Sequence, residues 1–264
     1  MLMTWIFVFS TLLAAPLAGA QGPSFDNHFQ AGLKAYQTKV YEEAEAHFKK
    51  ALEVDPRNAA AMIDLGLTYS QLSKPGHAIA WFRRTLAVDP SSAEARAALE
   101  YSLSKLEIKE IPHRIEMFET IRSHFLQRFS LVHFLGLGLI LLLAAGWGLL
   151  SWLGARRRAN KGEADEAPPA FPWTTGLLLV LFLLNTTGTA LKMIDLSEPR
   201  GTVVAVKVEA LSAPGADGVS LFELHQGFEV LVGELRDGWV QVTYPGGLTG
   251  WIPQADLIPL GGGF

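Results

Sequence analysis

Two long apolar runs without a formal charge constrain this chain more than any other feature of its sequence. Residues 131–153 and 171–191 contain no Asp, Glu, Lys or Arg. About 20 apolar residues cross the roughly 30 Å hydrocarbon core of a bilayer as a helix, so each run is long enough for one span. The absence of charge within both runs also argues against an ion or proton pathway. We therefore expect two transmembrane helices joined by a short loop.

The loop between the runs, residues 154–170, predicts the orientation of the pair. It begins with three consecutive basic side chains, Arg156, Arg157 and Arg158, and the positive-inside rule places such a loop in the cytoplasm. Residues 1–20 point the same way, because an apolar core followed by small residues is typical of a secretory signal peptide, with an uncleaved anchor as the alternative. Both signals place the parts before the first span and after the second span outside the cytoplasm.

Composition excludes several classes of function. The chain has 264 residues, a net charge of −4 and no cysteine, so thiol catalysis, thiolate metal sites and disulfides are excluded. The net negative charge argues against a nucleic-acid partner held through its phosphates. The seven histidines show no metal-ligand spacing, and neither a phosphate-binding loop nor a nucleophile elbow occurs. We expect no enzymatic activity, no cofactor and no metal.

Residues 25–92 repeat themselves with a fixed period of 34. The recurring pairs are Val54-Asp55-Pro56 with Val88-Asp89-Pro90, Ala44 with Ala78, Phe48 with Phe82, and Gly32 with Gly66. Small residues let two antiparallel helices pack closely, aromatic side chains fill the space between them, and Asp-Pro ends the second helix. This pattern resembles the tetratricopeptide repeat.

The resemblance implies an all-α solenoid over residues 21–110, with repeats at 25–58 and 59–92 and a capping helix at 93–109. About three repeats are usually needed to bury a continuous core, so we expect help from a partner, a second copy or the segment 113–129. That segment has an apolar face at helical spacing. It predicts a juxtamembrane helix within residues 111–130 that leads into the first span.

The concave face of such a solenoid is built mainly from the first helix of each pair. By the geometry of the family, it would present the protein-binding residues Phe29, Leu33, Tyr36, Ile63, Leu67, Ser70 and Tyr101. This groove is apolar and aromatic, which favours an apolar peptide or helix as ligand. The alternative interpretation is that several of these side chains pack between helices.

From Gly201 onwards the pattern changes from helical to alternating, which predicts short strands joined by tight turns. The motifs Arg236-Asp237-Gly238-Trp239 and Gly250-Trp251-Ile252 resemble the bacterial Src-homology-3-like domain. The resemblance implies a small all-β barrel over 199–260 that binds cell wall or peptide. Trp239 and Trp251 are candidates for its ligand surface, and their packing on the barrel core is the alternative.

The whole order resembles the BatE-type proteins of bacterial aerotolerance operons. This resemblance implies an inner-membrane protein with both soluble domains in the periplasm. It also implies partners such as von Willebrand factor A membrane proteins and a MoxR-type ATPase system. The first functional hypothesis is a scaffold that binds protein through its repeats and protein or wall through its barrel. The second is a peptidoglycan-binding module with the repeats as a spacer, and the third is a sensor, which the short loop 154–170 disfavours.

Overall fold

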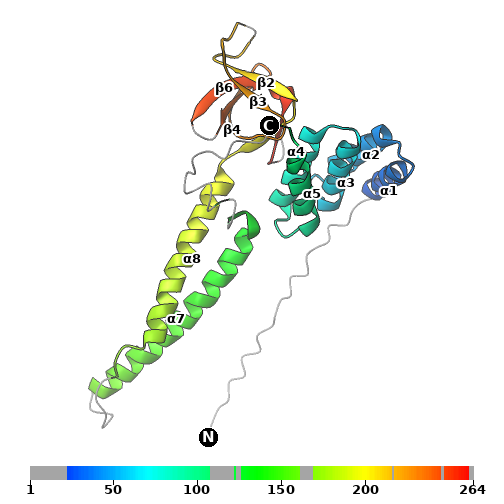
Figure 1. The fold of residues 1–264 in the computed structure, drawn as a ribbon. Coiled ribbons are helices and arrows are strands. Elements are labelled where there is room, and N and C mark those ends of the chain that lie inside the picture. The colour runs from blue at the N-terminus through cyan, green and yellow to red at the C-terminus, as the bar shows by residue number, and fades with distance from the viewer. Residues whose placement is uncertain are drawn as a thin grey trace.

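The computed structural model describes residues 23–107, 122, 126–160, 169–215, 217–244 and 247–261. It has three parts: a set of paired helices, a long helical hairpin and an antiparallel sheet (Figure 1). The predicted signal peptide at 1–20 lies outside the described residues. So do residues 161–168 of the predicted loop, and all of the predicted juxtamembrane helix before 126 except Arg122.

The paired helices follow the predicted period of 34. They are α1 (Pro23–Gln37), α2 (Tyr41–Val54), α3 (Ala59–Gln71), α4 (Pro75–Val88) and α5 (Ala93–Ser104). The turns inside the two pairs are equivalent, since Lys39 and Ser73 both adopt positive φ, at 62° and 58°. The side chains of Asn58 and Ser92 accept hydrogen bonds from the backbone N–H groups of Ala61 and Ala95. These caps satisfy backbone donors at the starts of α3 and α5.

The core of the helical part is built around two glycine–phenylalanine contacts. A Cβ atom on Gly32 would lie 2.7 Å from Cε1 of Phe48, and one on Gly66 would lie 2.5 Å from Cε1 of Phe82. Both rings are buried, at 0% and 1% exposure. The sequence recurrence is therefore a packing recurrence, because only glycine allows the ring of the second helix to approach the first helix so closely.

The hairpin consists of α7 (Leu131–Asn160) and α8 (Trp173–Ser197), preceded by the short 3-10 helix η1 (Leu126–Arg128). Both long helices are long and apolar enough to cross a membrane, and most of their apolar surface is exposed, unlike that of a soluble core helix. Each helix extends beyond the end of its predicted span. Helix α7 continues through the three arginines to Asn160, and α8 continues past residue 191 to Ser197. The helical pairs and the sheet lie at one end of the hairpin (Figure 1). The arginines lie in the last turns of α7, before the loop that joins α7 to α8.

The sheet contains seven strands and the 3-10 helix η2 (Gln254–Asp256). The strands are β1 (Arg200–Val203), β2 (Lys207–Leu211), β3 (Ser220–His225), β4 (Glu229–Arg236), β5 (Trp239–Tyr244), β6 (Leu248–Pro253) and β7 (Leu257–Pro259). Their order is β3-β2-β6-β5-β4-β1-β7, with antiparallel pairing throughout. One core lies under this sheet, with Val203, Leu224, Val230, Val240 and Ile252 fully or almost fully buried.

The predicted small all-β barrel is confirmed only as an antiparallel sheet, and this sheet is not a closed barrel, because its two edge strands β3 and β7 do not pair with each other. Closure of a barrel requires every strand to have two hydrogen-bonded neighbours. Strand β7 has only three residues, and all three are paired with β1. Strand β2 reaches β6 through one aligned pair, Leu211 with Trp251. The sheet is therefore open, with the six-residue β3 at one edge and the three-residue β7 at the other.

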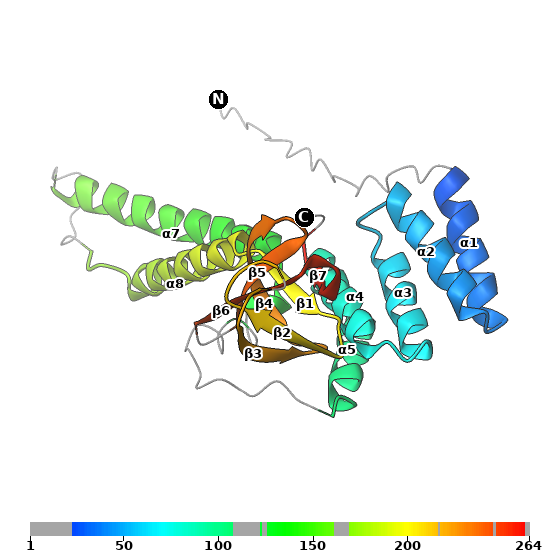
Figure 2. The same ribbon diagram turned by 90° about the horizontal axis from the view of Figure 1, so that it is seen from above.

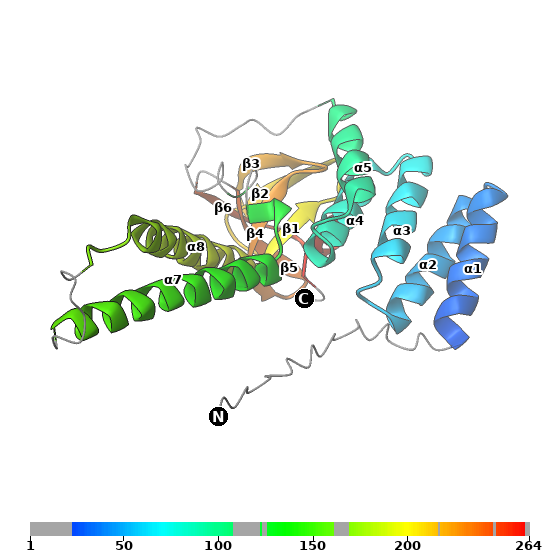
Figure 3. The ribbon, with the colours of Figure 1, turned by 90° about the horizontal axis from the view of Figure 1, so that it is seen from below.

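The sheet also rests on the helical pairs. Helix α4 contacts β1 and β7, and the views from above and below both show α4 beside the sheet (Figure 2 and Figure 3). A Cβ atom on Gly76 of α4 would lie 2.7 Å from the carbonyl oxygen of Val204, and one on Gly227 would lie 2.7 Å from Cδ1 of Leu106. The short solenoid is therefore covered at α4 by a sheet that begins more than a hundred residues after the end of this helix.

Candidate functional site

The residues predicted to form a groove lie on α1, α3 and α5. Phe29, Leu33, Tyr36 and Leu67 are partly buried and pack against the helical core. Each of these side chains therefore keeps one side in the core and leaves another part accessible. Residues from the first helix of each pair meet on one side of the solenoid, as the repeat geometry requires.

The other three predicted groove residues differ in exposure. Ile63 is 7% exposed and belongs to the core more than to the groove surface. Ser70 is exposed, and its hydroxyl donates a hydrogen bond to the carbonyl of Gly66 in its own helix. Tyr101 is 66% exposed, and the Lys105 ammonium lies 5.3 Å from its ring centroid. Tyr101 and Ser70 are thus the predicted groove residues that are freest to touch a partner.

A hollow beside the predicted groove residue Ile63 is acidic, which the sequence interpretation missed. A hollow of about 330 Å³ is lined by Ala59, Ala60, Ile63, Asp64, Asp89, Ser92 and Glu94. Burial raises the pKa of Asp64 to about 6, and the nearby charge of Glu94 contributes. The period of 34 places Glu94 at the position of Ala60, so an alignment of the first helices could have indicated that both acids lie near one another.

The two predicted tryptophans of the sheet lie on the same face. Trp239 is aligned with Pro253, and Trp251 with Gln241, while the intervening pair is Val240 with Ile252. Because alternate residues of a strand point to opposite faces, both tryptophans lie on the face opposite the buried Val240 and Ile252. Trp251 is only 7% exposed, and the Arg236 guanidinium lies 5.5 Å from its ring centroid. Trp239 is partly exposed, so it is the more accessible of the two.

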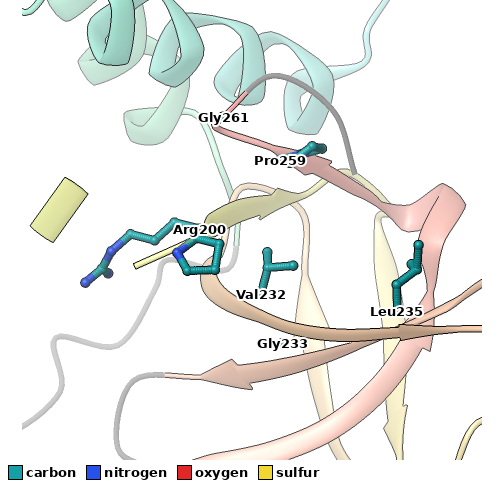
Figure 4. A pocket seen from close by; sticks show the side chains of 7 residues that line it. Arg200, Val232, Gly233, Leu235, Pro259 and Gly261 are labelled. Carbon is teal, nitrogen blue, oxygen red and sulfur yellow. The ribbon is translucent and has the colours of Figure 1, made fainter. Parts of the chain in front are cut away.

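A small pocket of about 270 Å³ lies where β1, β4 and β7 meet. It is lined by Pro199, Arg200, Val232, Gly233, Leu235, Pro259 and Gly261. The guanidinium of Arg200 extends away from Val232 and Leu235 (Figure 4), and it donates to the Glu198 carboxylate at 2.8 Å. The pocket walls are therefore mainly apolar and bring no convergent polar groups to a ligand.

Buried charges lie where the helical pairs, the sheet and the base of the hairpin meet. By the base of the hairpin we mean the end at which α8 finishes and the chain enters β1. Glu229 of β4 lies close to three guanidinium groups, those of Arg83, Arg122 and Arg200. Burial alone would raise the pKa of the Glu229 carboxyl, but the three arginines outweigh burial and hold this pKa below its ordinary value. The sequence interpretation did not single out any of these four residues.

The predicted topology residues Arg156, Arg157 and Arg158 are exposed near the end of α7. The Arg156 guanidinium lies 5.2 Å from the ring centroid of Trp152. Within the described residues, no group of three or more His, Asp or Glu side chains is arranged to hold a metal ion.

Comparison with known families identifies the helical part. Residues 28–91 match the family model of the tetratricopeptide repeat. The match extends from within α1 to just beyond the end of α4, so it confirms that the region with the 34-residue period consists of tetratricopeptide repeats. No curated protein matched the chain. Repeats of this class generally bind protein partners, which makes the groove of α1, α3 and α5 the candidate site.

Proposed function

We propose that this protein is a membrane-anchored scaffold that holds a protein segment in the groove of its tetratricopeptide repeats. The observation that carries the proposal is the repeat pair itself, with a match to the family over residues 28–91. Its groove presents partly exposed apolar and aromatic side chains, namely Phe29, Leu33, Tyr36, Leu67 and Tyr101. Such a surface suits the apolar face of a helix or an extended apolar segment.

The way in which the sheet packs on the repeats supports this use of the groove. The sheet contacts α4, the second helix of its pair, whereas the groove is built from the first helices α1, α3 and α5. The acidic hollow at Asp64 and Glu94 includes the predicted groove residue Ile63 in its lining. A basic residue in the bound segment would complement these carboxylates.

The hairpin supplies the anchor in this proposal. Helices α7 and α8 are long and apolar enough to span a membrane, and the repeats and the sheet lie at the same end of them (Figure 1). The exposed Arg156, Arg157 and Arg158 at the other end favour a cytoplasmic position for that end. We therefore propose that the chain is anchored in a bacterial inner membrane and that both soluble parts lie outside the cytoplasm.

The resemblance to BatE-type proteins extends the proposal to a cellular process. It suggests a stress-related membrane complex with von Willebrand factor A proteins and a MoxR-type ATPase system. It also suggests that the sheet, which is similar to the bacterial Src-homology-3-like domain in its Asp-Gly-Trp and Gly-Trp motifs, holds a second protein or the cell wall.

Site-specific photo-crosslinking in intact cells tests the scaffold hypothesis. A photoreactive amino acid replaces Tyr101 in the groove, and in a matched control it replaces Lys50, which is exposed on α2. The expected result is a discrete protein adduct from position 101 and none from position 50. Leu33 and Leu67 also pack on the core, so substituting them could unfold the repeats. The substitution that blocks the groove is therefore Ser70→Glu at an exposed position, which should remove the adduct. Equal adducts at both positions, or an adduct that Ser70→Glu leaves intact, would refute the groove as the binding site.

The position of the tryptophans also allows a second function, binding of peptidoglycan by the sheet with the repeats as a spacer. Trp239 is partly exposed on the face opposite the core, and an exposed aromatic ring can stack on a sugar. The test is sedimentation of the purified full chain with peptidoglycan. This hypothesis predicts that Trp239→Ala reduces the sedimented fraction, and it fails if the full chain stays in the supernatant.

A further inference from the structure

Three parts of the molecule meet at one group of buried charged residues, which we call the junction cluster. It comprises Arg83 of α4, Arg122 of the segment between α5 and η1, Lys192 and Asp195 of α8, Arg200 of β1 and Glu229 of β4. Their side chains are only 7% to 11% exposed. The cluster thus joins residues that lie more than a hundred positions apart in the sequence.

Glu229 is the centre of the cluster. Its Oε1 atom accepts a hydrogen bond from Nη2 of Arg122 at 2.9 Å and lies 3.6 Å from Nη1 of Arg200. Its Oε2 atom lies 3.6 Å from Nε of Arg83. One carboxylate therefore faces guanidinium groups from the repeats, from the sheet and from the segment that leads to the hairpin.

Arg83 fastens the repeats to the sheet. Its Nη1 atom donates to the carbonyl of Gly227 at 2.8 Å and to Oγ1 of Thr202 at 3.2 Å. The packing beside it is tight, since a Cβ atom on Gly227 would lie 2.9 Å from Cδ1 of Ile79. Gly76, Ile79 and Arg83 follow one another at helical spacing, so a single face of α4 makes this contact.

Lys192 and Asp195 connect the cluster to the hairpin. The Lys192 ammonium donates to the carbonyl of Leu126 at 2.8 Å and lies 3.3 Å from Oδ2 of Asp195. Nη1 of Arg122 lies 3.8 Å from Oδ1 of the same carboxylate. Arg122 therefore bridges Glu229 of the sheet and Asp195 at the base of α8.

Such a cluster resists partial separation. A buried charge is costly unless it is paired, and removing one partner leaves the other uncompensated. Moving the repeats away from the sheet would take Arg83 from Glu229 and from the Gly227 carbonyl. Moving the sheet away from the hairpin would take Glu229 from Arg122. Each separation is opposed by ion pairs whose other members are held by a different part of the chain.

We propose that the junction cluster is a coupling device that makes the repeats, the sheet and the base of the hairpin move as one unit. A force on the repeats is then passed through Arg83, Glu229 and Arg122 to the end of α8. The device does not depend on the identity of the groove ligand, and it adds a conformational link to the proposed scaffold.

Distance measurements on the full chain in lipid nanodiscs test the proposal. The chain has no cysteine, so spin labels can be attached at introduced cysteines. The pair Glu42→Cys and Glu209→Cys reports on the repeats against the sheet, and the pair Glu209→Cys and Arg157→Cys reports on the sheet against the hairpin. All three positions are exposed. Double electron–electron resonance should give a single narrow distance for each pair.

Substitutions in the cluster should then separate the two links. Glu229→Gln should abolish the narrow distance in both pairs. Arg83→Gln should abolish it only between repeats and sheet, because Glu229 keeps Arg122 and Arg200. Glu234→Gln is the matched control, since this carboxylate lies exposed in the same strand. The coupling device is refuted if Arg83→Gln leaves the repeat–sheet distance as narrow as in the original chain, or if that distance is already broad before substitution.

Discussion

Two contacts within this chain differ in the side chains that form them: the packing of α7 on α8, which we call the seam, and the junction cluster. At the seam, Gly138 lies against Asn185, Gly148 against Thr175, and Gly188 against Phe134. At the junction, Glu229 lies among guanidinium groups. The seam depends on the absence of side chains, whereas the junction depends on charge pairing.

The difference matches the surroundings that each contact would have in a membrane protein. Between two apolar helices in lipid, association depends on close van der Waals packing, which small residues allow. Where two water-soluble domains meet, buried charge can be compensated only by fixed partners, which makes the contact specific to one arrangement. The seam should therefore be sensitive to side-chain size, and the junction to loss of a single charge.

Removal of the central charge should have the largest effect. We expect Glu229→Gln to lower the free energy of unfolding by about 3 kcal/mol, because three buried guanidinium groups lose the carboxylate that they share. Urea unfolding of the purified chain, followed by tryptophan fluorescence, measures this change. The exposed Glu234→Gln should change it by less than about 0.5 kcal/mol. Equal effects of the two substitutions would contradict the role given to the cluster.

A larger side chain at a glycine of the seam should destabilise the packing of α7 on α8, with a smaller effect than Glu229→Gln. Gly138→Leu should destabilise the packing of α7 on α8 by about 2 kcal/mol, because a Cβ atom there would lie 2.7 Å from Nδ2 of Asn185 and overpacking costs energy of this order. Gly146→Leu is the control, since its Cβ would have no neighbour within 4 Å among the described residues. Crosslinking of introduced cysteines across the hairpin would report the packing, and similar loss in both variants would count against this seam.

Asp64 is a partly buried carboxylate that lies near another acid, Glu94, whereas Glu229 lies near arginines. Ionised Asp64 should therefore lower the stability of the repeats. Its pKa in the folded chain, about 6, lies above the ordinary value of 3.8, so the folded state binds more protons between these pH values. The stability from this group is present below about pH 3.8 and lost as the pH rises through 6. Asp64→Asn should therefore stabilise the repeats by about 1 kcal/mol at pH 8, after allowance for solvent screening.

Thermal unfolding of the full chain at pH 4 and pH 8 would measure this difference. The gain from Asp64→Asn should be clear at pH 8 and small at pH 4. Asp26→Asn, at an exposed position of α1, serves as the control. The same gain for Asp64→Asn at both pH values would show that the charge of Asp64 is not its cause.

The polar contact within the seam should matter least. Nδ2 of Asn185 donates to the carbonyl of Phe134 at 3.1 Å, and hydrogen bonds between membrane helices contribute about 0.6 kcal/mol on average. Asn185→Ala should thus weaken the hairpin by about this amount in an unfolding titration in detergent. A loss comparable to that of Glu229→Gln would mean that the seam, too, depends on polar pairing.

The repeats could be predicted from the sequence, because glycine, alanine and phenylalanine recur every 34 residues at the positions where the helices contact each other. The junction could not. Arg83 stands 34 residues after Lys49, and Lys49 is an exposed residue that pairs with Glu45 of its own helix. By the repeat pattern, Arg83 should also face solvent. Its side chain is only 10% exposed, because the sheet covers this face of α4.

The burial of Glu229 could not be predicted from the sequence for a similar reason. It precedes Val230 in a strand, and alternation assigns it to the face away from the core. That face meets solvent in an isolated sheet, but here α4 and Arg122 cover it. Alternation also could not show that the sheet stays open, since closure depends on how far β3 and β7 extend beside each other.

Labelling of single cysteines in intact cells would test most directly whether both soluble parts lie outside the cytoplasm. A membrane-impermeant maleimide should label Glu42→Cys in the repeats and Glu209→Cys in the sheet without permeabilisation. It should label Arg157→Cys only after the inner membrane is opened. Labelling of Arg157→Cys in intact cells, or protection of Glu42→Cys or Glu209→Cys once the outer layers are permeable, would contradict the account.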